Sequence, residues 1–320
     1  MKTYGGQAVL EGVMMRGQRS MAVACRAPTG EIITHFEELV SPIYRSRIAK
    51  MPFIRGAVMI WDTLALGMRA LMFAANIAAM EPPSAEGANT ETPKDAMPAT
   101  VLWTTMAIAL VGAIGLFFVL PVLAMGFLDQ FINQYPNSSL ISNLVEKILR
   151  LSLILGYMTL IGQIPDIRRV FMYHGAEHKT INAYEAGAPL TPESVQKFPI
   201  EHPRCGTTFL LIVVIVSFVV FSLLGQPAME WRIISRIVLV PVIAGIAYEF
   251  IRWAGARYHT NAFVRFIMTP GLAVQKITTR EPAFDQLAVA IAALQPVMAF
   301  EEPQTTATDQ APQPIPAAVN

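Results

Sequence analysis

The chain has 320 residues, of which 53% are hydrophobic and only 15% are charged, and its mean hydropathy is +0.45. Soluble domains carry about 25% charged residues, so this composition excludes an ordinary water-soluble globule and a disordered protein. A net charge of +1 excludes a broad basic surface, and we therefore expect no nucleic-acid partner. The two cysteines, Cys25 and Cys205, are too few for a disulfide framework.

Residues 1–56 are not membrane-like and are predicted to form a small cytoplasmic module. The glycines of the sequence GGQAVLEGVMMRG, from Gly5 onward, predict an irregular loop that approaches other backbone or a ligand. Two β-favouring runs, residues 21–26 and 31–35, flank turn residues at 28–30. This second pattern predicts a β-hairpin.

Long apolar runs predict a mainly α-helical, polytopic membrane domain over residues 101–282. A helix needs about 20 apolar residues to cross the roughly 30 Å hydrocarbon core. Four runs approach or exceed this length, and we expect each of them to span the bilayer: residues 101–128, 148–165, 207–225 and 233–251. The lipid bilayer is thus a predicted partner, and the sequence leaves protein partners open.

The other segments are predicted to lie outside the bilayer. Residues 57–80 are apolar but carry Asp62 and Arg69, which favours an amphipathic or re-entrant helix. Composition predicts a flexible linker at residues 81–100 and a disordered tail at residues 301–320. Between these, residues 283–300 are predicted to form an amphipathic helix that docks on the cytoplasmic side.

Lysine and arginine gather in three segments: before the first predicted span, between the second and the third, and after the fourth. The positive-inside rule places such segments in the cytoplasm. Four spans put all three segments on one side of the bilayer. We therefore expect an inner-membrane protein with both termini in the cytoplasm.

Three side chains in the segment YHGAEHKTINAYE are the first candidates for chemistry. On a helix, His174, Glu177 and His178 share one face, because positions i, i+3 and i+4 are neighbours. Their H-x-x-E-H order is that of inverted zincins, in which the histidines bind zinc and the glutamate is the general base for the metal-bound water. We predict that His174 and His178 bind a divalent metal, zinc before others, with Glu177 as the catalytic base.

Further candidate metal ligands are His202, Cys205 and Glu249. All three are expected at the same membrane face as His174, since they lie at the cytoplasmic ends of predicted spans. The sequence does not choose the third ligand among them. Each also has an ordinary interpretation: the histidines meet lipid headgroups, Cys205 is a small buried side chain, or Glu249 pairs with Arg252.

Other ionisable residues have weaker claims. Glu185 is expected to be solvated or to support the ligands. Glu11 serves either a function or a salt bridge with Arg16. Glu281 is a weak ligand candidate if the segment PGLAVQKITTREP folds back toward the site, and His259 is expected to be structural.

Five separated motifs together resemble the bacterial YqhQ-like family, a domain of unknown function designated DUF1385: GGQAVLEGVMMRG, YHGAEHKTINAYE, HPRCGTTFL, YEFIR and PGLAVQKITTREP. The resemblance covers roughly residues 2–294. It implies an integral membrane protein and a predicted metal-dependent enzyme, and it implies no substrate.

Two functions are therefore predicted as alternatives. The first is an integral-membrane metal-dependent enzyme, a hydrolase with a zinc-like site at the cytoplasmic membrane face. The second is a non-enzymatic membrane scaffold or assembly factor in which the same residues hold a structural metal. A catalytic zinc keeps one coordination position open, whereas four protein ligands close a structural one.

Overall fold

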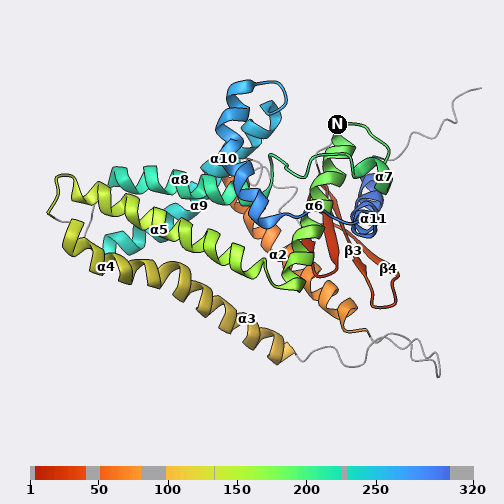
Figure 1. Cartoon of the computed structure of the whole chain (residues 1–320), viewed down its shortest axis with the longest axis horizontal. Coiled ribbons are helices and arrows are strands. Elements are labelled where there is room, and N and C mark those ends of the chain that lie inside the picture. The colour runs from red at the N-terminus through yellow and green to blue at the C-terminus, as the bar shows by residue number, and fades with distance from the viewer. Residues whose placement is uncertain (1–3, 41–50, 81–98, 133, 225–228, 303–320) are drawn as a thin grey trace, which may run out of the picture.

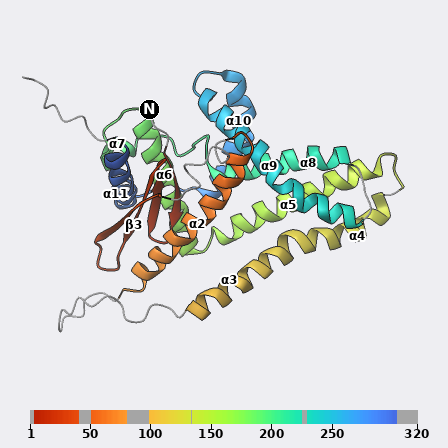
Figure 2. The ribbon, with the colours of Figure 1, turned by 180° about the vertical axis from the view of Figure 1, so that it is seen from behind.

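The computed structural model describes residues 4–40, 51–80, 99–132, 134–224 and 229–302 (Figure 1). A module built on one β-sheet lies at one end, and long helices extend away from it (Figures 1 and 2). Helix α6 (Pro165–Glu185) stands where the two parts meet, beside the sheet. Helix α2 (Ile54–Ala78) runs diagonally from the sheet toward the long helices.

The sheet is an antiparallel meander whose strand order follows the chain. Its strands are β1 (Gly5–Val9), β2 (Gly12–Arg16), β3 (Ser20–Arg26) and β4 (Ile32–Glu38). Strands β3 and β4 form the predicted hairpin, with Cys25 opposite Ile33. Gly30 in the connecting turn has a φ of +90°, a conformation that glycine adopts without strain. The prediction of this hairpin is confirmed.

Helices cover both faces of the sheet, so nearly every residue of β2 and β3 is buried. Successive side chains of a strand point to opposite faces. Val13 and Met15 therefore pack against α6 and α11 (Phe284–Glu301). Met14 points the other way and packs with Leu66 of α2. The result is a three-layer arrangement of helix, sheet and helix.

The glycine-rich start of the chain forms strands β1 and β2, and the prediction of an irregular loop there is wrong. The two strands pair in register, with Gly5 opposite Arg16. The glycines allow close packing between layers: a Cβ atom at Gly6 would lie 2.8 Å from Cγ of Glu177 in α6. The turn itself contains Glu11, whose φ is +49°. The glycine-rich composition suggests an irregular loop, because composition alone does not show the helices that pack closely on these strands.

Among the described residues, four helices are long and apolar enough to cross a membrane. They span Ile54–Ala78, Ala107–Ile132, Gly206–Leu224 and Val238–Arg257. The first is α2, and the second comprises the C-terminal half of α3 (Ala99–Ile114), the π-helical turn η2 (Gly115–Val119) and α4 (Leu120–Ile132). The third is α8 (Gly206–Leu224), and the fourth is most of α9 (Met229–Arg257). The chain is mainly helical, as predicted, and its orientation in the membrane stays a prediction.

These four helices are not the four predicted from the sequence. Helix α2 is among them, although its C-terminal half packs on the sheet through Ala70 and Ala74. The predicted span at residues 148–165 is not among them. Helix α5 (Ser138–Ile161) ends before Pro165, which opens α6, and carries three charged residues in its middle. Proline fits the first turn of a helix, so the apolar run ends with α5 and Pro165 begins a new, more polar helix.

Helix α11 confirms a helix near residues 283–300 but not its amphipathic, surface-docked character. Leu287, Ala290 and Leu294 are fully buried in the core between the sheet, α6 and the short helix α7 (Pro192–Val195). The helix is a structural layer of the module. Residues 81–98 of the predicted linker and residues 303–320 of the predicted tail lie outside the described residues.

Candidate metal centre

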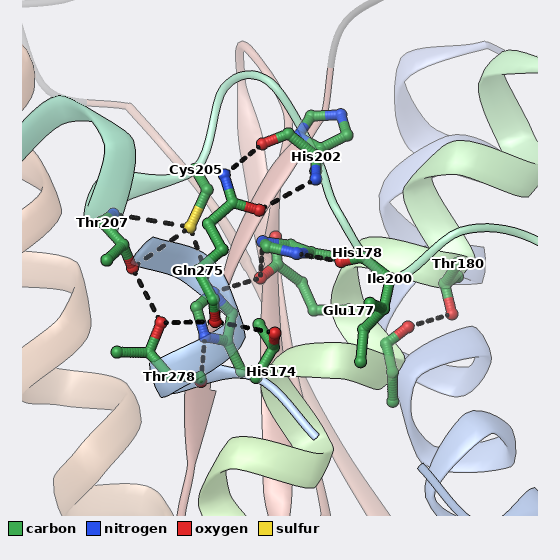
Figure 3. Close-up of polar contacts among 12 residues, drawn as sticks. His174, Glu177, His178, Thr180, Ile200, His202, Cys205, Thr207, Gln275 and Thr278 are labelled. Atoms are coloured by element: carbon green, nitrogen blue, oxygen red, sulfur yellow. Dashed lines mark hydrogen bonds and ion pairs between the residues drawn. The ribbon is translucent and has the colours of Figure 1, made fainter. Parts of the chain in front are cut away.

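Helix α6 supplies most of the candidate site. From Phe171 to Tyr184 almost all of its residues are buried, because the sheet covers one side. The other side meets the segment of residues 196–205 and the end of α10 (Ala262–Thr278) (Figure 3). The site therefore lies inside the junction between the sheet module and the long helices.

His174, His178 and Cys205 form a cluster of potential metal ligands (Figure 3). One ligand atom from each residue lies within 4.8 Å of the other two. His174 Nε2 and Cys205 Sγ are 3.4 Å apart, and the centroids of the two imidazole rings are 4.4 Å apart. Ligand atoms around one tetrahedral zinc lie about 3.3–3.6 Å apart, given bond lengths of about 2.0–2.3 Å. The cluster thus nearly has the spacing that such an ion requires.

Backbone carbonyls hold both imidazoles in a single tautomer. His174 Nδ1 lies 2.9 Å from the carbonyl oxygen of Thr278, and His178 Nδ1 lies 2.7 Å from that of Ile200. A carbonyl oxygen can only accept, so in both rings Nδ1 donates the proton and Nε2 keeps its lone pair. Metal-binding histidines are commonly oriented in this way. Both Nε2 atoms are therefore available to bind a cation.

Glu177 lies between the two imidazoles. Its Oε2 is 3.9 Å from Nε2 of His174 and 3.9 Å from Nε2 of His178. The carboxyl group is buried and accepts a hydrogen bond from the backbone N–H of Gly6. Burial raises the pKa of Glu177, and His174 and the Gly6 N–H oppose that shift. A buried carboxyl group of raised pKa beside potential metal ligands suits proton transfer.

Gln275 of α10 fixes the segment that carries Cys205. Its side chain is fully buried; Oε1 accepts from the His202 backbone N–H at 3.0 Å, and Nε2 donates to the His202 carbonyl at 2.8 Å (Figure 3). The same Nε2 also donates to Thr208 Oγ1 at 2.7 Å. These bonds hold residues 202–208 against α10, and Cys205 lies within that segment.

His202 lies beside the cluster of three. Its ring centroid is 5.6 Å from that of His178, and its Nε2 is 3.6 Å from Oε2 of Glu185. Burial lowers the pKa of His202 to about 4, which keeps its imidazole neutral at pH 7. Burial acts to raise the pKa of Glu185, but hydrogen bonding to His202 and Arg204 lowers it to about 2. Glu185 thus supports the segment around His202.

Glu249, a predicted ligand candidate, lies apart from this cluster. Its carboxylate forms a salt bridge with Arg55 of α2, and Arg55 Nε donates to it at 2.5 Å. It does not belong to the metal-competent group found among the described residues. The packing of α2 against α9 brings Arg55 to this carboxylate. Arg55 is thus the partner in place of Arg252, which sequence spacing suggested.

The structure also pairs two other acidic residues. Glu11 accepts hydrogen bonds from Arg169 at 2.5 and 2.6 Å and is not paired with Arg16, because the β1–β2 turn meets α6. Glu281 forms a salt bridge with Lys179. Both pairs hold α6 in place rather than adding ligands.

Sequence reasoning missed the groups that orient the candidate ligands. The carbonyls of Ile200 and Thr278 and the N–H of Gly6 are backbone groups, so side-chain spacing does not reveal them. The segment PGLAVQKITTREP does fold back to the site, where it contributes the Thr278 carbonyl. One usable signal was Gln275, a polar side chain on the helical face shared by Val264, Met268 and Gly271.

A cavity of about 300 Å³ adjoins the site on the outer side of residues 199–203. Its walls come from that segment, from α10 and from the connection before α10; among them are Glu201, Tyr258, His259, Thr269 and Lys276. His259, predicted to be structural, therefore lines a cavity. The candidate ligands themselves do not line it.

Comparison with known proteins now places the chain. Residues 51–300 match the model of a family described as "Protein of unknown function (DUF1385)". The chain belongs to the DUF1385 family. It is 32% identical over 304 residues to the "Uncharacterized protein YqhQ" of Bacillus subtilis (strain 168), which covers 93% of each chain. No solved structure matches the chain. The family resemblance seen in the motifs is confirmed, and the family description adds no activity.

Proposed function

We propose that this DUF1385 protein is an integral-membrane metalloenzyme of the hydrolase class, with a zinc-like site at the cytoplasmic membrane face. His174, His178 and Cys205 would bind the metal, and Glu177 would act as general base. The observation that carries this proposal is the pair of carbonyl bonds at Nδ1, which leaves Nε2 of each imidazole as its ligating nitrogen, together with the Cys205 thiol 3.4 Å from Nε2 of His174. A metal-binding histidine commonly donates the N–H of its other ring nitrogen in this way, which supports metal binding by both rings.

The ligand set suits catalysis because three protein ligands would leave one position of a tetrahedral ion open. Three protein ligands with one open position are the usual arrangement of a catalytic zinc, which lowers the pKa of its bound water to about 7. Glu177 is close enough to the histidines to accept a proton from a water in that position. The transferred proton would stay on a carboxyl group whose pKa is already raised by burial.

Metal analysis of the full chain, purified in detergent, tests the ligand set. We expect about one equivalent of metal in the wild type, with a strong loss in the His174→Ala/His178→Ala double variant and in Cys205→Ser. His259→Ala is the matched control, because this exposed histidine lies outside the cluster. Metal content that is low and equal in all four proteins would overturn the proposal.

Glu177→Gln separates a base from a ligand. A general base can be replaced by an amide without loss of the metal, whereas removal of a ligand weakens binding. We expect Glu177→Gln to retain metal as well as the wild type does. Loss of metal similar to that in Cys205→Ser would instead make Glu177 the fourth ligand of a closed, structural site, in line with a scaffold function.

Cobalt substitution tests for the open coordination position without knowledge of the substrate. A thiolate-to-cobalt absorption band should appear in the wild type and in Glu177→Gln but not in Cys205→Ser. Addition of a small hydroxamate should change the ligand-field bands if one position is exchangeable. Bands that do not respond to hydroxamate or to other small ligands would contradict a catalytic site.

A further inference from the structure

Helix α10 exposes large aromatic side chains away from the candidate metal centre. Phe263 and Phe266 are 66% and 76% exposed, and both lie in the first turns of this helix. Large aromatic side chains with such exposure are rare on a surface that faces only water. We therefore expect a partner other than water to cover these two side chains.

Successive positions on a helix are about 100° apart, which divides the exposed side of α10 into two flanks. One flank is apolar and carries Phe263, Phe266 and Pro270. The other flank carries Arg265, Thr269 and Lys276, all of them exposed. A helix that carries one apolar and one cationic flank fits the boundary between acyl chains and headgroups.

The inner side of α10 fixes where the helix lies. Val264 and Met268 pack in a cluster with residues of α8 and α9. A Cβ atom at Gly271 would lie 2.5 Å from Cγ2 of Thr208, so the backbone of α10 packs closely against the Thr208 side chain there. Thr208 is in the first turn of α8, one of the four membrane-capable helices. Helix α10 therefore crosses α8 at its end, where a spanning helix would leave the hydrocarbon core.

The direction of α10 agrees with that position. In both overall views α10 rises across the direction of α8 and α5 (Figures 1 and 2). If α8 spans the bilayer, α10 lies along the membrane surface. The adjoining end of α9 carries Trp253, with Arg257 stacked over its ring at 5.4 Å, and such aromatic and cationic side chains favour the interface.

We propose that α10 is an interfacial helix whose apolar flank, with Phe263 and Phe266, inserts into the leaflet next to the sheet module. Its occupant is the lipid leaflet, because α10 packs against the end of a membrane-capable helix and its exposed apolar side chains are bordered by cationic ones. The cationic flank then faces the headgroups, and Lys276 lines the cavity beside residues 199–203. The proposal thus places that cavity at headgroup depth. It does not depend on whether the neighbouring cluster binds metal.

Depth-dependent quenching in proteoliposomes tests this proposal. Phe266→Cys and Lys276→Cys place an environment-sensitive fluorophore on the apolar and the cationic flank of the helix, about 80° apart around its axis, in full-length protein. Unmodified wild-type protein gives the labelling background, since its two cysteines, Cys25 and Cys205, are buried. Phosphatidylglycerol and phosphatidylcholine vesicles with brominated acyl chains supply the quencher.

We expect acyl-chain bromines to quench the label at position 266 by roughly half or more, because interfacial helices insert about 5–10 Å. The label at position 276 should lose a much smaller fraction of its emission. Absent quenching at position 266, or equal quenching at both positions, would overturn the proposal. Phe263→Cys and Arg265→Cys repeat the comparison if either first variant fails to fold.

Discussion

Replacement of Gln275 by alanine is predicted to damage both stability and metal binding. The substitution removes three hydrogen bonds. The His202 N–H loses its buried partner, and the His202 C=O keeps only the longer bond from the Cys205 N–H, at 3.3 Å. Each bond contributes about 0.5–1.5 kcal/mol net, so the loss should be roughly 2–4 kcal/mol in free energy of unfolding. Because this segment carries Cys205, we also expect metal affinity to fall about 10–100-fold, as for other groups that support ligands.

The free energy is measured by denaturant titration of the full chain in detergent, and the affinity by competition with a metal chelator. Gln286→Ala is the matched control. Gln286 is equally buried, but the one bond seen in the described part of the chain is to the Ala283 N–H, at 3.0 Å. Its loss should cost only about 0.5–1.5 kcal/mol. If Gln275→Ala destabilises no more than Gln286→Ala, or binds metal like the wild type, Gln275 does not fix the site.

Three other changes test the fold around the site. Leu66 is fully buried between α2 and the sheet, so Leu66→Ala should cost about 2–5 kcal/mol in unfolding free energy. The control Leu64→Ala should cost far less, because Leu64 is 65% exposed. Equal losses would contradict the packing of α2 on the sheet. Glu301→Ala should cost about 1–3 kcal/mol, because the buried carboxylate accepts from the Arg19 N–H at 2.6 Å, and unchanged stability in the same titration would exclude this anchor of α11. The pKa of Glu185 is lowered to about 2, so its stabilising effect should be complete above its ordinary pKa of 4.5 and should fall as the pH drops toward 2. Glu185→Gln should therefore lower the free energy of unfolding at pH 7 and not at pH 2. A difference between the two proteins that does not change with pH would refute the charge-based account.

The parts of the site that depend on local spacing could be predicted from the sequence. His174, Glu177 and His178 lie on one helix, so helical geometry alone brings their side chains together. Cys205 required a long-range contact, and the sequence also offered His202 and Glu249 as the third ligand. The pairing of Glu249 with Arg55 depends on the packing of α2 and α9, which no local pattern shows.

The fold, like the site, was predicted correctly where it depends on neighbouring residues and incorrectly where it depends on long-range packing. The β3–β4 hairpin follows from a local turn, and α8 follows from one uninterrupted apolar run. Strands β1 and β2 have a composition that suits a loop, yet helices on both faces of the sheet enclose them. Helix α11 was placed correctly along the chain, but its burial on nearly all sides depends on a sheet about 250 residues earlier in the sequence, a separation at which contacts leave no periodic signal.

The amino-acid sequence by itself determined the long apolar helices, the helix that bears the two histidines and their shared face, because hydropathy and helical periodicity are properties of neighbouring residues. The tertiary structure decided which distant side chain joins the two histidines, which tautomer each imidazole adopts and which acidic candidate forms a salt bridge elsewhere. Those outcomes depend on backbone carbonyls and on crossings between helices, whose positions exist only once the chain has packed.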